Sequence, residues 1–214
     1  MTRPVSSIVA SIGKLSLRWL DKNYPFRKKA IRRLVQKSRF TEPMSHALLD
    51  VLFRELTQAK LLNLLKAELG DPKVLDEFRY DRLTGKWQRA RGPRVITHIF
   101  SGNVPNPSIV SFVLGMLVKS VNIGKVSSRD EGILDIYLDS LKTVDRRLAE
   151  TNRLLDSRDK KALASAIQMS GLVVAYGADE SLKEIRALVP GGTRFVGYGH
   201  RMSFAVYPKE AFSE

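Results

Sequence analysis

Asn103 is the first residue of this chain whose type and position suggest chemistry. It lies in a turn between Gly102 and Pro105, directly after the strand-like run V-I-T-H-I-F at 95–100. A side-chain amide in such a turn can donate a hydrogen bond to a carbonyl oxygen that is gaining negative charge, as in an oxyanion hole. The alternative is an asparagine that bonds its own turn backbone, which is a common arrangement.

A second group of polar side chains follows the next strand-like run, V-N-I-G-K at 121–125. Lys125 ends that run, and Ser127 and Ser128 come directly after it. An ammonium and two hydroxyls at the carboxyl edge of a sheet suit a ribose or its 2′-phosphate. The alternative is a solvated lysine followed by a helix cap, since Ser128 and Glu131 have the S-x-x-E spacing of a capping box.

Gly177 is the third candidate, because it follows the apolar run 172–176 and precedes a helical pattern. A glycine there lets the backbone approach a ligand closely, and the helix N-terminus favours an anionic phosphate. The alternative is an ordinary strand-to-helix turn. His98 lies within an apolar run and is expected in the core. The chain has three histidines far apart in sequence and no cysteine, so we expect no metal site.

The elements that must position these residues alternate between short apolar runs and helical patterns. Residues 95–128 have the order of a βαβ crossover, and strands are also predicted at 172–176, 194–196 and 203–207. A further strand should occupy 152–156, but N-R-L-L-D is polar for one. The pattern predicts an α/β fold with a Rossmann-like parallel sheet and a helical N-terminal extension.

The N-terminal part is predicted to be helical. Apolar spacing indicates a helix at 5–20, a second after Pro25, and one long third helix from Thr41 to Gly70. Residues 71–94 are rich in turn residues, with a short hairpin around 83–87. We therefore divide the chain into a basic helical extension at 1–70, a linker at 71–94 and a Rossmann-like cofactor-binding domain at 95–214.

Composition limits the class of protein. The 214 residues are 43% hydrophobic, with no apolar run long enough for a membrane span and no secretory cleavage pattern, so we expect a cytoplasmic protein. The formal charge is +14, and residues 1–40 hold eleven Lys or Arg against one acid. Such an arm attracts phosphates of nucleic acid, lipid or coenzyme A, or is a solvated helix face. A nucleic-acid- or partner-binding protein acting through this arm is the alternative function.

Four segments together resemble the acyl-CoA reductase family of bacterial luminescence, within the aldehyde dehydrogenase superfamily. They are G-N-V-P at 102–105, K-V-S-S-R-D at 125–130, V-V-A-Y-G-A-D-E-S at 173–181 and Y-G-H-R-M-S-F at 198–204. The resemblance implies a sheet of the aldehyde dehydrogenase type, an oxyanion role for Asn103 and a ribose-binding role for Lys125. It places 198–204, with His200 and Arg201, near the catalytic pocket. Val126 and Ala178 depart from the common Pro and Ser of the superfamily.

The same resemblance implies a reaction. The family reduces a fatty acyl thioester, on coenzyme A or on a protein, to the aldehyde with NADPH, through a cysteine thiolate that takes the acyl group. This chain has no cysteine. We therefore expect it to be the NADPH-binding half of such a reductase, inactive alone. Its expected partners are the acyl thioester and either a second copy or a complementing catalytic domain, and we do not expect nucleic acid.

Overall fold

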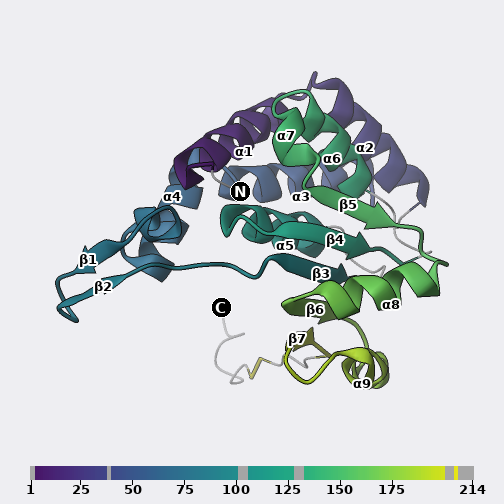
Figure 1. The fold of residues 1–214 in the computed structure, drawn as a ribbon. Coiled ribbons are helices and arrows are strands. Elements are labelled where there is room, and N and C mark those ends of the chain that lie inside the picture. Colours follow the sequence, from purple (N-terminus) through teal and green to yellow (C-terminus); the bar gives the residue numbers. More distant parts are fainter. Residues whose placement is uncertain (1–2, 38–39, 101–105, 128–132, 201–204, 207–214) are drawn as a thin grey trace.

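The computed structural model describes residues 3–37, 40–100, 106–127, 133–200 and 205–206. Its centre is a parallel sheet of five strands in the order β5-β4-β3-β6-β7 (Figure 1). The strands are β3 Val95–Ile99, β4 Val121–Lys125, β5 Asn152–Leu155, β6 Leu172–Tyr176 and β7 Arg194–Tyr198. The Rossmann-like prediction is confirmed, and β5 forms despite its polar sequence.

Helices cover both faces of the sheet (Figure 1). One face carries α5 Asn106–Leu117, α6 Ile133–Lys142 and the short α7 Arg146–Ala149, and the other carries α8 Lys160–Met169 and α9 Asp179–Leu188. The two faces have separate buried clusters, a large one around Phe112 and Ile136 and a small one around Ile167 and Val173. This double covering explains why the central strands read as continuous apolar runs.

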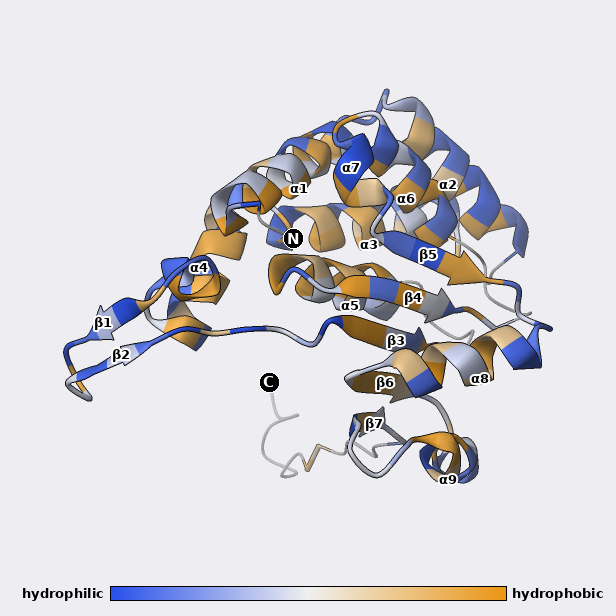
Figure 2. Ribbon diagram, viewed as in Figure 1, coloured by the Kyte–Doolittle hydropathy of each residue, from blue (hydrophilic) through white to orange (hydrophobic). Residues whose placement is uncertain are grey.

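The N-terminal helices belong to the larger of these two clusters. They are α1 Val5–Leu20, α2 Pro25–Lys37, α3 Glu42–Glu55 and α4 Gln58–Leu69. Their apolar sides face inward and their polar sides face outward (Figure 2), and the buried Trp19 ring stacks on Phe53 at 4.5 Å between centroids. The helices of the predicted extension therefore share a core with α5 and α6. The domain boundaries stay a prediction.

The predicted single helix from Thr41 to Gly70 is wrong, because the chain breaks between α3 and α4. Thr57 has extended backbone angles and begins a new helix, and the carbonyl of Leu56 accepts a hydrogen bond from Ser16 of α1 at 2.8 Å. The break lets the start of α4 pack closely on α1. A Cβ on Gly13 would lie 2.7 Å from the Cβ of Gln58, so only glycine fits at that contact.

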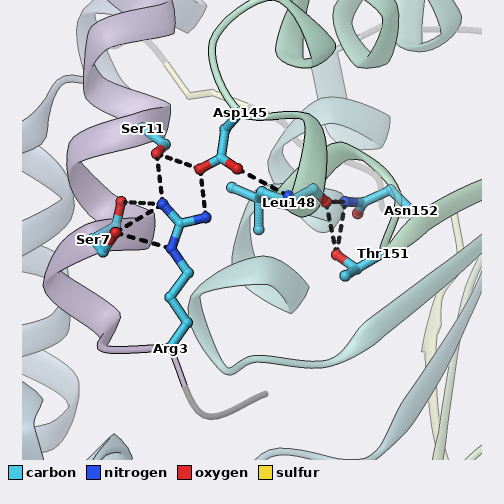
Figure 3. A network of polar contacts seen from close by, with 7 residues as sticks. All are labelled: Arg3, Ser7, Ser11, Asp145, Leu148, Thr151 and Asn152. Carbon is cyan, nitrogen blue, oxygen red and sulfur yellow. Dashed lines mark hydrogen bonds and ion pairs between the residues drawn. The ribbon is translucent and has the colours of Figure 1, made fainter.

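Several cations of the basic arm are used within the fold. Arg27 is fully buried and pairs with Asp50 at 2.7 Å, and Arg33 pairs with Asp135 at 2.7 Å. Arg3 pairs with Asp145 at 2.5 Å and also donates to Ser7 and Ser11, so the start of α1 is joined to α7 (Figure 3). These residues therefore tie the N-terminal helices to the rest of the fold.

The segment before the sheet contains the predicted hairpin. A 3₁₀ turn at Pro72–Leu75 leads into β1 Arg79–Asp81 and β2 Lys86–Gln88, which pair antiparallel and project from the body (Figure 1). The strand predicted at 203–207 lies almost wholly outside the described residues, and Ala205 and Val206 are not in a strand. Within the described ranges, no helix combines the length and apolar character that a bilayer crossing requires.

Candidate functional site

Parallel pairing brings the ends of four strands to one edge of the sheet. Ile99 of β3 lies opposite both Lys125 of β4 and Ala175 of β6, and Tyr176 lies opposite Tyr198 of β7. The chain after β3 also begins at this edge, since the Phe100 N–H donates to the Lys125 carbonyl at 3.0 Å. Ligands of open α/β sheets bind outside the carboxyl ends of the strands. We call this region the carboxyl edge.

Lys125 is at the carboxyl edge, as the sequence predicts. It is half-buried, and no described residue forms an ion pair or side-chain hydrogen bond with its ammonium. Ser127 follows it and is also half-buried. Asn103 and Ser128 lie outside the described residues, so their predicted roles keep the status of predictions.

Gly177 lies at the same edge, directly after β6. Its N–H donates to the Tyr198 carbonyl at 3.2 Å. A Cβ on Gly177 would meet only the Cβ of Ser181 at 3.7 Å, an ordinary contact, so no described neighbour requires a glycine here. That open space is consistent with the predicted close approach of a ligand to the backbone.

The helix after Gly177 has an acidic first turn, and the predicted phosphate contact at its N-terminus stays a prediction. The first turn of α9 carries Asp179 and Glu180, and Ala178 provides no side-chain cap. Two carboxylates at a helix N-terminus are attracted by the helix dipole themselves and repel a further anion. This turn is therefore better suited to an uncharged part of a ligand, such as a ribose or a planar ring.

Three aromatic rings stack side by side along the carboxyl edge. Phe100 and Tyr176 have centroids 5.6 Å apart, and Tyr176 and Tyr198 are 4.7 Å apart with nearly parallel planes. Burial raises the pKa of the Tyr176 phenol, and a hydrogen bond with Ser111 opposes that effect. Tyr198 is 47% exposed, so the stack ends in a ring on which a planar ligand group can pack.

The sequence analysis assigned no role to the Tyr176 ring, and it placed Tyr198 near the catalytic pocket only as the first residue of the segment 198–204. Each is the last residue of a strand and is followed by glycine, and this repeated Tyr-Gly pair is the signal that could have identified them. Their contact depends on the pairing of β6 with β7, which the sequence does not specify.

A chain of buried polar groups lies behind this edge and is centred on His98. Its Nε2 is 3.0 Å from Asn122 Oδ1, and its Nδ1 is 2.8 Å from Ser111 Oγ. The Asn122 amide donates onward to Asn152 Oδ1 at 2.8 Å. Because Asn122 Oδ1 can only accept, Nε2 carries the proton and Nδ1 accepts from Ser111.

His98 is neutral near pH 7. Burial lowers the pKa of its imidazole to about 4, although the hydrogen bond with Asn122 opposes part of that shift. This agrees with the expectation that His98 is a core residue. A base with so low a pKa is poorly matched to proton transfer at neutral pH.

The other two histidines are elsewhere in the fold. His200 is exposed and follows Tyr198 at the carboxyl edge, whereas His46 on α3 lies 3.9 Å from Glu42. Among the residues that the structure describes, no three His, Asp or Glu side chains gather where they could hold a metal ion. Arg201 lies outside the described residues.

The carboxyl edge thus combines an available ammonium, an open glycine turn and an exposed aromatic ring on a doubly covered parallel sheet. The sheet and its helices define an α/β domain of the Rossmann type. A family comparison agrees: residues 1–214 match the family described as acyl-CoA reductase (LuxC). The chain belongs to this family.

Curated relatives are similar over nearly the whole chain. The long-chain acyl-protein thioester reductase of Photorhabdus luminescens is 24% identical over 206 residues, which are 94% of this chain and 42% of the relative. The enzyme of the same name from Aliivibrio fischeri is 23% identical, over 94% of this chain and 43% of its own length. The chain therefore spans less than half the length of these relatives.

Solved structures place the fold in the aldehyde dehydrogenase type. An NAD-dependent benzaldehyde dehydrogenase from Corynebacterium glutamicum has a TM-score of 0.67 at 11% identity, over 92% of this chain and 42% of that one. A betaine aldehyde dehydrogenase from Staphylococcus aureus, solved with NAD+, has a TM-score of 0.64 at 15% identity, over 91% and 38%. At such identities the likeness concerns the fold alone.

Proposed function

We propose that this chain is the NADPH-binding part of an enzyme that reduces a long-chain acyl thioester to the aldehyde. Its curated relatives are named long-chain acyl-protein thioester reductases, and the two dehydrogenases of similar fold are described with NAD or NAD+. The single observation that carries the proposal is the position of Lys125, whose ammonium has no partner among the described residues, at the edge where such sheets bind nucleotides.

In this proposal each part of the edge contacts a different part of the cofactor. The Lys125 ammonium and the Ser127 hydroxyl bind the ribose and its 2′-phosphate, with Ser128 beside them in sequence. The open backbone at Gly177 and the exposed ring of Tyr198 contact uncharged parts. Asn103 donates to the thioester carbonyl oxygen as it gains charge.

Replacing Lys125 by methionine should weaken NADPH binding by roughly tenfold, because a charge-assisted hydrogen bond is lost while the stem keeps its length. Titration of NADPH fluorescence measures the dissociation constant. NADH, which lacks the 2′-phosphate, should lose less affinity than NADPH in the same variant.

Lys142→Met is the matched control. Lys142 is the last residue of α6, and both its side chain and that of its ion-pair partner Asp139 are exposed to solvent. That variant should bind NADPH as the unmodified chain does. Equal affinities for NADPH in the Lys125 variant and the control, with both folded, would remove Lys125 from the cofactor site.

The chain alone should form no aldehyde from a long-chain acyl-CoA and NADPH. A thiolate is the nucleophile that the family resemblance implies, and the sequence contains no cysteine. Aldehyde can be measured by trapping with a hydrazine reagent. Turnover by the purified chain would show that the reaction does not require a cysteine thiolate.

A further inference from the structure

A hollow lies at the amino edge of the sheet, at the opposite ends of the strands from Lys125. It has a volume of about 500 Å³ and is lined by residues that precede or begin three strands, including Arg94, Val121 and Thr151. Arg89 and Arg91 line it as well. We call this hollow, together with its continuation past Thr151, the amino-edge groove.

The charge of this hollow is entirely positive. Its lining contains Arg89, Arg91, Arg94 and Lys119 and no acid. Lys119 forms an ion pair with Asp76, whereas the three arginines have no ion pair or side-chain hydrogen bond within the part of the chain that the structure describes. Arg89 also lines a neighbouring hollow that contains Asp71, Asp76 and Glu77, whereas Arg91 and Arg94 do not, and their guanidinium groups add positive charge that no carboxylate in the lining of this hollow offsets.

The groove continues past Thr151 into a neighbouring hollow of about 770 Å³. That hollow adds Arg147, which has no described partner, and one carboxylate, Asp145. Asp145 is already occupied: it pairs with Arg3 and accepts from Ser11 at 2.6 Å and from the Leu148 N–H at 3.0 Å (Figure 3). The continuation is therefore also positive.

The backbone that carries the arginines is held in place on both sides. The Ala90 N–H donates to the Val74 carbonyl at 2.9 Å, and the Ser120 hydroxyl donates to the Pro93 carbonyl at 2.6 Å. Between them, Gly92 packs so closely on Val118 that an added Cβ would lie 2.5 Å from the Val118 carbonyl oxygen. The guanidinium groups thus extend from a fixed base, which lowers the ordering cost of binding an anion.

The shape and lining of the groove select the kind of anion. Two open, polar hollows that share Thr151 suit an extended chain better than a compact ligand, which prefers an enclosed and largely apolar pocket. No aromatic side chain is among the residues that line the two hollows, so stacking with nucleic-acid bases is not provided. The planar guanidinium group of an arginine can donate two parallel hydrogen bonds to one carboxylate.

We propose that the amino-edge groove docks an extended acidic segment of a partner protein. Asp and Glu side chains of that segment pair with Arg89, Arg91 and Arg94, and the segment continues over Thr151 toward Arg147. The surface is separate from the carboxyl edge, so this proposal does not depend on the assignment of the cofactor site.

The test uses a fluorescein-labelled decaglutamate peptide and its anisotropy on titration with the full chain at about 50 mM salt, where screening is limited. The variant Arg91→Glu/Arg94→Glu reverses two charges in the groove. The control Lys28→Glu/Lys29→Glu reverses two exposed charges on α2, which contributes no residue to the groove, and gives the same net charge.

The groove variant should bind the peptide at least roughly tenfold more weakly than the unmodified chain, and the control should stay within about twofold. All three proteins should bind NADPH equally, which separates this result from the test of Lys125. Equal losses in the two variants would overturn the proposal in favour of net charge alone. Tighter, groove-dependent binding of a ten-nucleotide RNA, or displacement of the peptide by equimolar tripolyphosphate, would also overturn it.

Discussion

Replacing Asp50 by alanine should lower the free energy of unfolding by about 3 kcal/mol, because it leaves a buried guanidinium without its counter-charge. Arg27 is fully buried, and its Nη1 lies 2.7 Å from Asp50 Oδ1. The same guanidinium donates to the Trp19 carbonyl at 2.8 Å and lies near His46, and its Nε has no hydrogen-bond partner among the described residues. These contacts do not supply the negative charge that Asp50 supplies.

Urea denaturation followed by circular dichroism measures this loss. Asp139→Ala is the matched control, since Asp139 pairs with Lys142 at 2.8 Å on the surface, where both side chains are about half exposed. An exposed pair contributes less than about 1 kcal/mol, so the control should be close to the unmodified chain. Similar losses in the two variants would show that burial of Arg27 does not make its partner essential.

The burial of Arg27 shows one limit of sequence reasoning. A run with Arg27, Lys28 and Lys29 reads as a solvated or ligand-binding face, because charged side chains are seldom fully buried. The packing of α2 against α3 brings Asp50 to this guanidinium, and the turn between α1 and α2 brings the Trp19 carbonyl to it. The local pattern gives the helix correctly, but the long-range contact decides which of its cations point inward.

Strand β5 shows a second limit. N-R-L-L is polar for a strand, yet Asn152 uses its polar atoms inside the fold: its amide donates to the Leu148 carbonyl at 2.7 Å and its oxygen accepts from Asn122. Because β5 is an edge strand, Arg153 can point to solvent. Polar residues are therefore tolerated at the edge of a sheet where they would not be in its centre.

The position of Lys125, in contrast, follows from the sequence alone. A βαβ crossover makes its two strands parallel, so that residues after both strands must meet at one edge. The register of Ile99 with Lys125 confirms this part of the reasoning. The stack of Tyr176 on Tyr198 could not be derived in this way, since it depends on which strands are neighbours.

The free energy of unfolding should fall as the pH is lowered, because His98 takes up a proton when the chain unfolds. This prediction has the second largest expected effect. The pKa of His98 is about 4 in the folded chain and 6.5 without burial, so the unfolded chain binds more protons between these values. The contribution of neutral His98 is therefore fully present above about pH 6.5 and is lost as the pH falls toward 4. Between pH 7 and pH 5 the loss should be about 2 kcal/mol.

The variant His98→Gln isolates this effect, because glutamine does not titrate and its amide can still bond Ser111 or Asn122. Unfolding in urea at pH 7 and pH 5 should show a fall in stability that is about 2 kcal/mol larger for the unmodified chain than for the variant. Carboxylates that titrate in the same range affect both proteins and cancel in the difference. If both lose equal stability, His98 accepts a proton in the folded chain, and the hydrogen bonds with Ser111 and Asn122 do not hold it neutral.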